Sequence, residues 1–365
     1  MNNKKKHKIA LIGYRLGIGG AEKVMARLSI FFEKNGVEVH NIIVLDVVEY
    51  QFSGELLNLG KLKNESNGFL NKFKRLKALN AYLNQEKFDF IIDFRFRNKI
   101  IQELIIAKYI YRTKSIFTIH SYLIDYYMPS ISWLTRFMYN SSYANVSITN
   151  QMQVLIEKKH QLQNLITIHN PIDLDEINLK SSQQIEIDYE YIIAVGQYET
   201  KIKQFDKLIH SYANSVLPSK EIHLIILGDG SKEYLEIAAQ QSNVSDKVHL
   251  LGFKENPFSY LKNAKFLVLC SQNEGMPNVI LESLACNTPV ISFDCESGPR
   301  EMIENHVNGI LVSNQDFDQL TVAINYLTEN TELYKYCKSN ALQSIQKFSI
   351  ETIGRQWLQL LNTSN

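Results

Sequence analysis

The sequence predicts an α/β protein with two domains, each built on a doubly wound parallel sheet. Its 365 residues exceed what one hydrophobic core usually organises. Short apolar runs alternate with helical patterns through both halves of the chain, which is typical of parallel βαβ units. The alternation breaks once, between about residues 170 and 188, and then begins again.

In the first half, we expect each apolar run to form a buried strand and each amphipathic stretch to form a connecting helix. The expected strands cover residues 8–13, 39–45, 88–93, 115–120, 144–149 and 165–169, and the helices lie near 21–35, 100–111 and 152–159. The segment from Asn170 to Asp173 contains a proline and interrupts the pattern. We therefore expect an N-terminal domain of residues 1–173.

The second half repeats the same organisation. Strands are expected at 191–195, 222–227, 248–250, 266–270, 289–292 and 309–311, which gives a C-terminal domain of residues 174–347. A last helical pattern near 350–361 lies beyond this sheet. We expect residues 348–365 to form a helix that packs back towards the N-terminal domain.

Composition excludes several classes of protein. Apolar residues make up 45%, charged residues 21%, and the formal net charge is +1, which is ordinary for a globular protein and does not predict a nucleic-acid partner. The four cysteines have no C-x-x-C spacing, so we expect reduced thiols in a cytoplasmic protein. No apolar run approaches the roughly 20 residues of a membrane-spanning helix, so any membrane contact is expected to be peripheral.

The strongest motif directly follows the expected strand at 266–270. It reads Glu274, Gly275, Met276, Pro277, Asn278, Val279, Ile280, Leu281, Glu282. A helix that starts near Asn278 would place Glu274 in the preceding loop and Glu282 one turn inside. Its first backbone N–H groups and positive dipole end would suit a phosphate. Two glutamates at this spacing are also common as solvated surface charges.

The wider segment, with Leu284-Ala285-Cys286, the 289–292 strand and Gly298-Pro299-Arg300-Glu301, resembles the donor-site region of family 4 glycosyltransferases. The resemblance implies a GT-B fold, in which two Rossmann-like domains face a central cleft. It also implies that the C-terminal domain holds most of a nucleotide-sugar and that no metal or other cofactor is required.

Within this segment the resemblance gives each residue a role. It implies that Glu274 binds hydroxyls of the donor sugar and Glu282 those of the ribose. Gly275 and Met276 are expected to contact the donor, and backbone N–H groups around Pro277–Val279 to hold its phosphate. Asn287 stands where the family usually has glycine, and asparagine tolerates the left-handed backbone such a position requires.

A second match follows the expected strand at 191–195. Gly196 and Gln197, then Lys203-Gln204-Phe205-Asp206, resemble segments whose arginine and lysine grip the donor pyrophosphate. Lys203 matches, but Gln197 replaces the arginine, so a charged fork becomes a neutral amide. Lys201 is a candidate to supply the missing charge, and solvent exposure is the alternative for either lysine.

Near the N-terminus, Gly17-Ile18-Gly19-Gly20-Ala21-Glu22 links the first strand to a helix. Glu22 occupies the third glycine position of G-x-G-x-x-G, which argues against an NAD-dependent oxidoreductase. The loop resembles the GGAE loop of family 4 transferases, in which Gly19 and Gly20 would close over donor phosphate and acceptor. A tight strand-to-helix turn is the alternative.

Four more residues lie at or just beyond expected strand ends, where open α/β sheets bind ligands. His120 resembles the family's active-site histidine, with an implied role in positioning and in transition-state polarisation. Arg95 and Arg97 are candidates to bind an acceptor phosphate, with surface salt bridges as the alternative. Leu251-Gly252-Phe253 resembles a segment against which the nucleotide base packs in the family, so Phe253 is expected to bind the donor.

The stretch from Phe69 to Leu83 has approximate helical spacing and a basic flank formed by Lys72, Lys74, Arg75 and Lys77. Such a helix can lie on an anionic membrane, and an ordinary amphipathic surface helix is the alternative.

Together the resemblance implies a retaining glycosyltransferase with catalytic residues His120, Lys203 and Glu274. The expected donor is a UDP-sugar, with GDP-sugars as the alternative, and the expected acceptor is a glycan or polyprenyl-linked oligosaccharide at the inner face of the cell membrane. Because Gln197 departs from the pattern, a catalytically weak GT-B binding or scaffold subunit is the second hypothesis.

Overall fold

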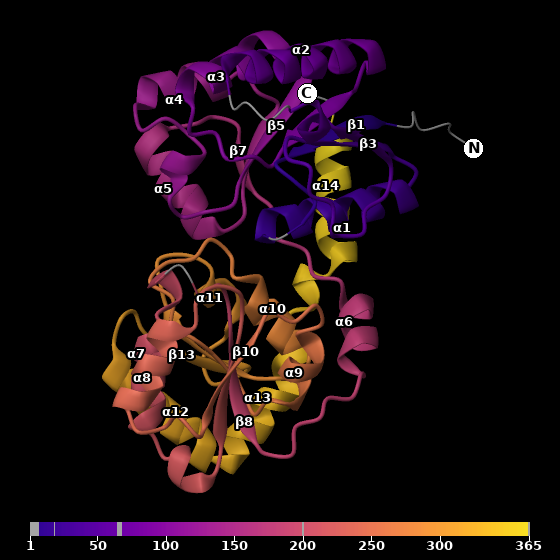
Figure 1. The fold of residues 1–365 in the computed structure, drawn as a ribbon. Coiled ribbons are helices and arrows are strands. Elements are labelled where there is room, and N and C mark those ends of the chain that lie inside the picture. Colours follow the sequence, from indigo (N-terminus) through magenta and orange to yellow (C-terminus); the bar gives the residue numbers. More distant parts are fainter. Residues whose placement is uncertain (1–6, 18, 64–67, 199–200, 364–365) are drawn as a thin grey trace, which may run out of the picture. The chain divides into compact units, whose positions relative to one another are not determined.

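The computed structural model describes residues 7–17, 19–63, 68–198 and 201–363. The chain divides into two compact units, one of Met1–Pro171 with Ile350–Asn365 and the other of Ile172–Ser349 (Figure 1). The boundaries expected after residues 173 and 347 each differ from these by two residues.

The N-terminal unit contains a seven-stranded parallel sheet in the order β3-β2-β1-β4-β5-β6-β7. Its strands are β1 (Lys8–Gly13), β2 (Glu38–Ile43), β3 (Glu55–Asn58), β4 (Phe90–Asp93), β5 (Lys114–Ile119), β6 (Ala144–Ser147) and β7 (Leu165–Thr167). Six of these match expected strands. The short edge strand β3 was missed, because its half-exposed Glu-Leu-Leu-Asn sequence carries no buried apolar run.

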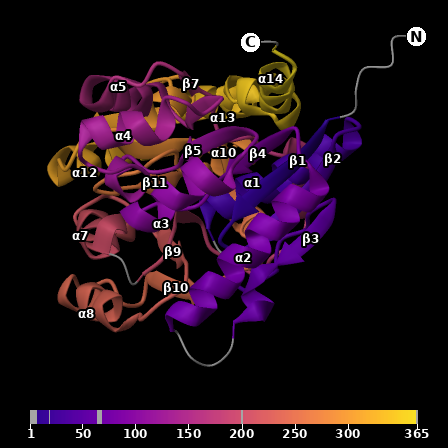
Figure 2. The same cartoon turned by 90° about the horizontal axis from the view of Figure 1, so that it is seen from above.

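Helices cover both faces of this sheet (Figures 1 and 2). They are α1 (Gly20–Lys34), α2 (Phe69–Glu86), α3 (Ile100–Ile105) continued by the π-helical turn η2 (Ile106–Ile110), α4 (Ser132–Tyr139), α5 (Asn150–His160) and α14 (Ile350–Asn362). From β1 to β3 the strands are added on one side of β1, and from β4 onwards they are added on its other side. Because βαβ crossovers are right-handed, α1 lies on one face of the sheet and α2, α3 and α4 lie on the other.

The final helix, α14, belongs to the N-terminal unit and completes its core. Ile353, Trp357 and Leu361 are buried in the same apolar cluster as Phe31 and Phe32 of α1. A hydrogen bond from the Tyr143 hydroxyl to the Leu360 carbonyl oxygen, 2.9 Å long, ties the end of the helix to the sheet.

The C-terminal unit contains a six-stranded parallel sheet in the order β10-β9-β8-β11-β12-β13. The strands are β8 (Tyr191–Val195), β9 (His223–Leu227), β10 (Val248–Gly252), β11 (Leu267–Leu269), β12 (Val290–Asp294) and β13 (Gly309–Ser313). The α-helices are α6 (Leu174–Ser181), α7 (Phe205–Ala213), α8 (Glu233–Gln241), α9 (Phe258–Asn263), α10 (Asn278–Ala285), α11 (Pro299–Met302), α12 (Phe317–Glu329) and α13 (Thr331–Ser344).

Each sheet has one point where its strand order reverses, between β1 and β4 in the first unit and between β8 and β11 in the second. Ligands of open α/β sheets bind beyond the carboxyl ends of the strands at such a point. The segments that follow these four strands contain most of the predicted site residues. Among the described residues, no helix has the length and apolar content needed to cross a bilayer.

Candidate functional site

The switch point of the C-terminal unit is built around an ion pair between Lys203 and Glu274. Lys203 ends the 3-10 turn η4 (Lys201–Lys203), which follows β8, and Glu274 lies in the loop after β11. Lys203 Nζ is 2.5 Å from Glu274 Oε1, and the side chains are 21% and 13% exposed. The pair is therefore only partly withdrawn from water, and a ligand could separate its members.

Gly196 makes room for this pair. A Cβ added at Gly196 would lie 3.0–3.2 Å from three side-chain carbons of Lys203, closer than most real contacts. The Lys203 stem therefore runs directly over the glycine backbone. Gln197, the next residue, is exposed at the end of β8.

Gln204 joins the loop after β8 to the end of β11. Its backbone is left-handed, with φ 51°, and its side-chain Nε2 donates a 2.8 Å hydrogen bond to the Cys270 carbonyl oxygen. The backbone N–H of Gln272 donates to the Ile202 carbonyl oxygen at 2.8 Å. These bonds hold Lys203 opposite Glu274. Sequence reasoning missed the role of Gln204, and its polar side chain beside a buried Phe205 was the available signal.

The loop from Gly275 to Pro277 leads into α10, which begins at Asn278 as expected. Ser297 Oγ donates a 2.9 Å hydrogen bond to the Gly275 carbonyl oxygen. Gly298 has φ 98°, and a Cβ there would meet Pro277 Cδ and the Gly275 carbonyl oxygen at 2.6 and 2.7 Å. The 297–298 turn therefore supports this loop from behind, and only glycine fits at 298.

The remaining residues of the motif differ in how far they are exposed to solvent. Glu282 and Met276 are buried, whereas Asn278 and Val279 are partly exposed on the first turn of α10. Asn287 has φ 58°, which confirms the left-handed geometry expected of it. Phe253 is exposed and follows β10, the edge strand that lies two strands from β8.

In the N-terminal unit, the glycine-rich loop ends with a tight turn into α1. Gly19 is the N-cap residue and has φ 135°, a conformation open to glycine. Gly20 begins the helix, and the Glu22 carboxylate folds back over Gly19. Burial raises the pKa of Glu22, while Arg15, 3.9 Å away, opposes that shift.

His120 follows β5 and is held by a short relay. Its Nε2 is 2.9 Å from Thr118 Oγ1, which lies 3.0 Å from the Asp93 carbonyl oxygen. The carbonyl can only accept, so the threonine proton points to it and Nε2 must carry the proton that Thr118 accepts. Nδ1 of His120 is then an unprotonated acceptor, buried without a partner among the described residues.

The charge state of His120 agrees with this tautomer. Burial, and then the neighbouring Arg97 guanidinium, lower the pKa of His120 to about 3. The imidazole is therefore neutral at physiological pH, and its free lone pair suits a hydroxyl donor better than a phosphate oxygen. Sequence reasoning missed Thr118, although its position two residues before His120 on one strand places both side chains on the same face.

Comparison with known proteins agrees with this architecture across the chain. The family described as "Glycosyltransferase Family 4" matches residues 18–176, and "Glycosyl transferases group 1" matches residues 175–344. The chain belongs to the family 4 glycosyltransferases. The two matches meet at the boundary between the structural units, so each unit of this glycosyltransferase corresponds to one family domain.

Two curated relatives of this glycosyltransferase span most of its length. It is 27% identical to the N-acetylgalactosamine-N,N'-diacetylbacillosaminyl-diphospho-undecaprenol 4-alpha-N-acetylgalactosaminyltransferase of Campylobacter jejuni, over 97% of this chain and 99% of the relative. It is 25% identical to the lipopolysaccharide 1,6-galactosyltransferase of Escherichia coli, over 87% and 88% of the two chains.

A solved structure shows the same fold. The Anabaena HepE complex with UDP-glucose aligns with a TM-score of 0.78 and 18% identity, over 97% of this chain and 99% of that one. Its likeness to the present enzyme supports the GT-B assignment.

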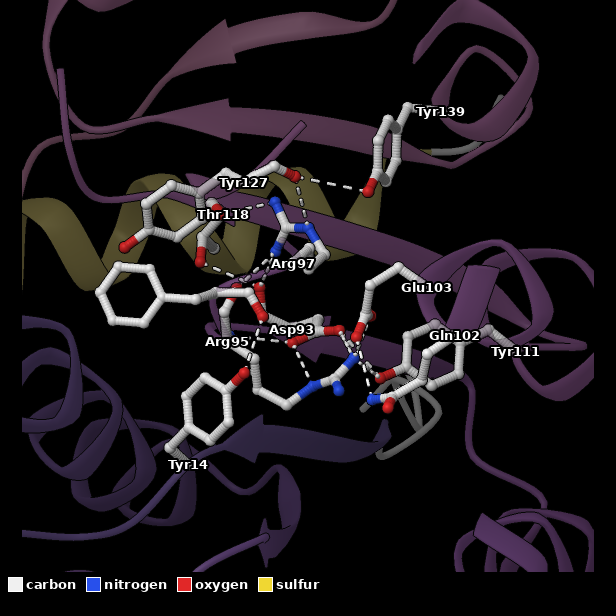
Figure 3. A network of polar contacts seen from close by, with 11 residues as sticks. Tyr14, Asp93, Arg95, Arg97, Gln102, Glu103, Tyr111, Thr118, Tyr127 and Tyr139 are labelled. Carbon is white, nitrogen blue, oxygen red and sulfur yellow. Dashed lines mark hydrogen bonds and ion pairs between the residues drawn. The ribbon is translucent and has the colours of Figure 1, made fainter. Parts of the chain in front are cut away.

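The roles expected for Arg95 and Arg97 in this glycosyltransferase are corrected by the structure. Both are buried, at 3% and 1% exposure, so neither forms a surface salt bridge or presents its guanidinium to an acceptor. Arg95 makes two hydrogen bonds to the Asp93 carboxylate, at 3.0 and 2.7 Å, and one to Glu103 at 3.0 Å (Figure 3). Burial opposes ionisation of Asp93, but the two arginines outweigh it and lower the pKa of its carboxyl.

Arg97 binds backbone carbonyl groups instead of carboxylates. It donates to Tyr127 O at 3.1 Å and Thr118 O at 2.9 Å, and also to the carbonyls of Asp93 and Arg95 (Figure 3). The rings of Phe117, Tyr127 and Tyr139 surround its guanidinium. Arg97 therefore joins the ends of β4 and β5 to the following loop, and it sets the geometry around His120.

Proposed function

We propose that this glycosyltransferase moves a sugar, with retention of anomeric configuration, from a UDP-sugar to a glycan or polyprenyl-linked oligosaccharide in surface polysaccharide synthesis. The observation that carries the proposal is the Lys203–Glu274 pair at the switch point of the second sheet, beside the N-terminus of α10. The name of the Campylobacter relative, which includes an undecaprenol diphosphate, supports the acceptor class. The UDP-glucose complex of HepE supports the donor class.

In this proposal the donor replaces an internal ion pair by two new contacts. Lys203 Nζ moves to the diphosphate and Glu274 accepts hydrogen bonds from sugar hydroxyls. N–H groups of the first turn of α10 donate hydrogen bonds to phosphate oxygens, and Glu282 accepts hydrogen bonds from the ribose hydroxyls. As the bond to the diphosphate breaks, Lys203 and the helix N-terminus stabilise the growing negative charge, which supplies most of the rate enhancement.

The N-terminal residues complete the assignment on the family resemblance. Gly19 and Gly20 offer backbone to the donor phosphate, and His120 accepts a hydrogen bond from a substrate hydroxyl through Nδ1. The acceptor hydroxyl attacks from the face on which the diphosphate departs, and no side chain is assigned as a covalent nucleophile. We also propose that Phe253 contacts the nucleotide base.

The proposal also includes the cellular location of the enzyme and its metal requirement. The enzyme acts in the cytoplasm at the inner face of the membrane, in peripheral contact with anionic lipid. On the family resemblance, we also propose that catalysis needs no metal, and we expect turnover to persist in EDTA.

The donor class is tested by thermal unfolding with UDP, GDP, ADP, CMP and NAD at equal millimolar concentrations. A ligand present at 100 times its Kd stabilises the native state by about 2.7 kcal/mol. We expect UDP to raise the melting temperature more than the other nucleotides do. In Lys203→Ala, UDP should raise it less than in the wild type. A UDP shift without sugar transfer would favour a binding or scaffold role, in line with Gln197 at the arginine position. An NAD shift alone would overturn the proposal.

A further inference from the structure

Two short helical segments of the N-terminal unit expose large apolar side chains. Ile101, Ile105 and Tyr109 lie four residues apart along α3 and η2, and Trp133 and Phe137 lie four apart on α4, so each set forms a single stripe. The five side chains are between 39% (Ile105) and 77% (Ile101) exposed. We call them the apolar face.

The two stripes are neighbours. Lys108 Nζ, on η2 next to Tyr109, lies 4.8 Å from the centre of the Phe137 ring on α4 and donates a 2.7 Å hydrogen bond to Ser141 Oγ. Both views of the fold place α3 beside α4 (Figures 1 and 2). Contiguous exposed apolar surface of this kind marks a site of interaction with another protein, a ligand or a membrane.

The charged side chains near the apolar face indicate which kind of partner it binds. Between residues 95 and 141 the only acidic residues are Glu103 and Asp125. Glu103 is buried against Arg95, and Asp125 forms a 2.6 Å ion pair with Lys159. Basic side chains that are not buried accompany the face: Lys99, Lys108, Arg112 and Arg136. The face is therefore apolar with a positive border.

We propose that the apolar face docks the enzyme on an anionic lipid surface. Aromatic side chains favour the boundary between headgroups and hydrocarbon, and lysine and arginine beside them attract anionic headgroups. Short helices bind this way by burying one apolar side in the interface. The biological purpose rests on the proposed function, because a polyprenyl-linked acceptor is presented at a membrane.

The face differs from the basic helix singled out in the sequence. On α2, Lys72, Lys74 and Lys77 are exposed, and so are Leu70 and Phe73, whereas Leu79 and Leu83 are buried. Arg75 is turned inward, with Nη1 donating to the Val44 carbonyl oxygen at 3.1 Å. Among its described side chains, the helix therefore presents two exposed large apolar groups against five on the apolar face, and we assign insertion to the apolar face.

The experiment measures co-sedimentation of the full chain with vesicles of phosphatidylglycerol and phosphatidylethanolamine, and with phosphatidylcholine alone. Trp133 is an internal reporter, because the other tryptophan, Trp357, is 2% exposed. We expect binding to the anionic vesicles with a blue shift of Trp133 emission. Ile101→Ser combined with Phe137→Ser should lower the partition coefficient about tenfold or more. The matched control, Leu179→Ser with Val322→Ser, removes two exposed apolar side chains of the other unit and should bind as wild type.

Three results would overturn the proposal: no binding of the wild type to anionic vesicles, equal loss in the control, or wild-type binding by the Ile101/Phe137 variant. If that variant instead abolishes self-association seen by light scattering, a second copy covers the face. The assay contains no nucleotide or sugar, so its failure is distinguishable from failure of the transferase proposal. The melting temperature of each variant reports whether it is folded.

Discussion

Each of the two switch points holds an ion pair, but the two pairs differ in how they are used. At the end of β4, Arg95 and Asp93 form a buried pair, and Arg95 Nε and Nη2 donate hydrogen bonds to Asp93 and Glu103 within the unit. Beyond β11, Lys203 and Glu274 also form a pair, but it is partly exposed and rests on glycine. A charged side chain at a strand end is thus structural when the surrounding protein buries it and supplies its hydrogen-bond partners. It is available for a ligand when water still reaches it.

The first test of this comparison concerns stability. Arg95→Ala would leave the Asp93 and Glu103 carboxylates buried without their partner, which should cost about 3–5 kcal/mol of unfolding free energy. Both tryptophans lie in the N-terminal unit, so urea denaturation followed by tryptophan fluorescence reports on that unit. The exposed Lys159–Asp125 pair of the same unit provides a control, and Lys159→Ala should cost about 1 kcal/mol or less. Similar losses in both variants would contradict the distinction.

The second test concerns turnover. Glu274→Gln and Lys203→Ala should each lower kcat about 10²–10³-fold, equivalent to about 2.7–4 kcal/mol of transition-state stabilisation. Their unfolding free energies should stay within about 1 kcal/mol of wild type, because the pair is partly solvated. Lys220→Ala, an exposed lysine of the same unit on the turn before β9, is the matched control for loss of a lysine. Wild-type turnover in both Glu274→Gln and Lys203→Ala would remove them from the site.

The third test addresses the relay to His120. Thr118→Val removes the hydroxyl that accepts from Nε2, so the imidazole loses its fixed tautomer and turnover should fall about tenfold, or about 1.4 kcal/mol. The ¹⁵N chemical shifts of the His120 ring should show Nε2–H in wild type and a mixture in Thr118→Val. Thr118→Ser keeps the hydroxyl and should restore both the turnover and the ¹⁵N chemical shifts of the wild type. If Thr118→Val retains the wild-type shifts, the relay does not set the tautomer.

The fourth test concerns pH. The folded-state pKa of His120, about 3, lies below its usual value of about 6.5, so the unfolded chain binds an extra proton between these values. Stability from this group is complete above pH 6.5 and is lost as pH falls. Between pH 6.5 and 5 we expect a loss of about 1–2 kcal/mol, which His120→Gln should abolish. An identical pH dependence in that variant would exclude His120 as the cause.

Local sequence was sufficient for much of the fold and for part of the site. Alternating apolar runs predicted all six strands of the second sheet and six of seven in the first, because buried parallel strands need apolar residues on both faces. The start of α10 at Asn278 was also predictable from its immediate neighbours, and the left-handed backbone of Asn287 from the glycine that the family resemblance implies there. The family resemblance then supplied the candidate roles of Lys203 and Glu274.

Long-range packing determined the rest. Arg95 became structural because Glu103 and Tyr111 approach it from other segments, and the tautomer of His120 depends on a carbonyl of a neighbouring strand. The last helix joins the first unit because its apolar stripe fits against α1, about 320 residues earlier in the chain. Residue type and local period indicate which groups can ionise, bond or pack. Burial and the choice of partner arise only when distant segments meet, because they depend on how much water the surrounding chain excludes.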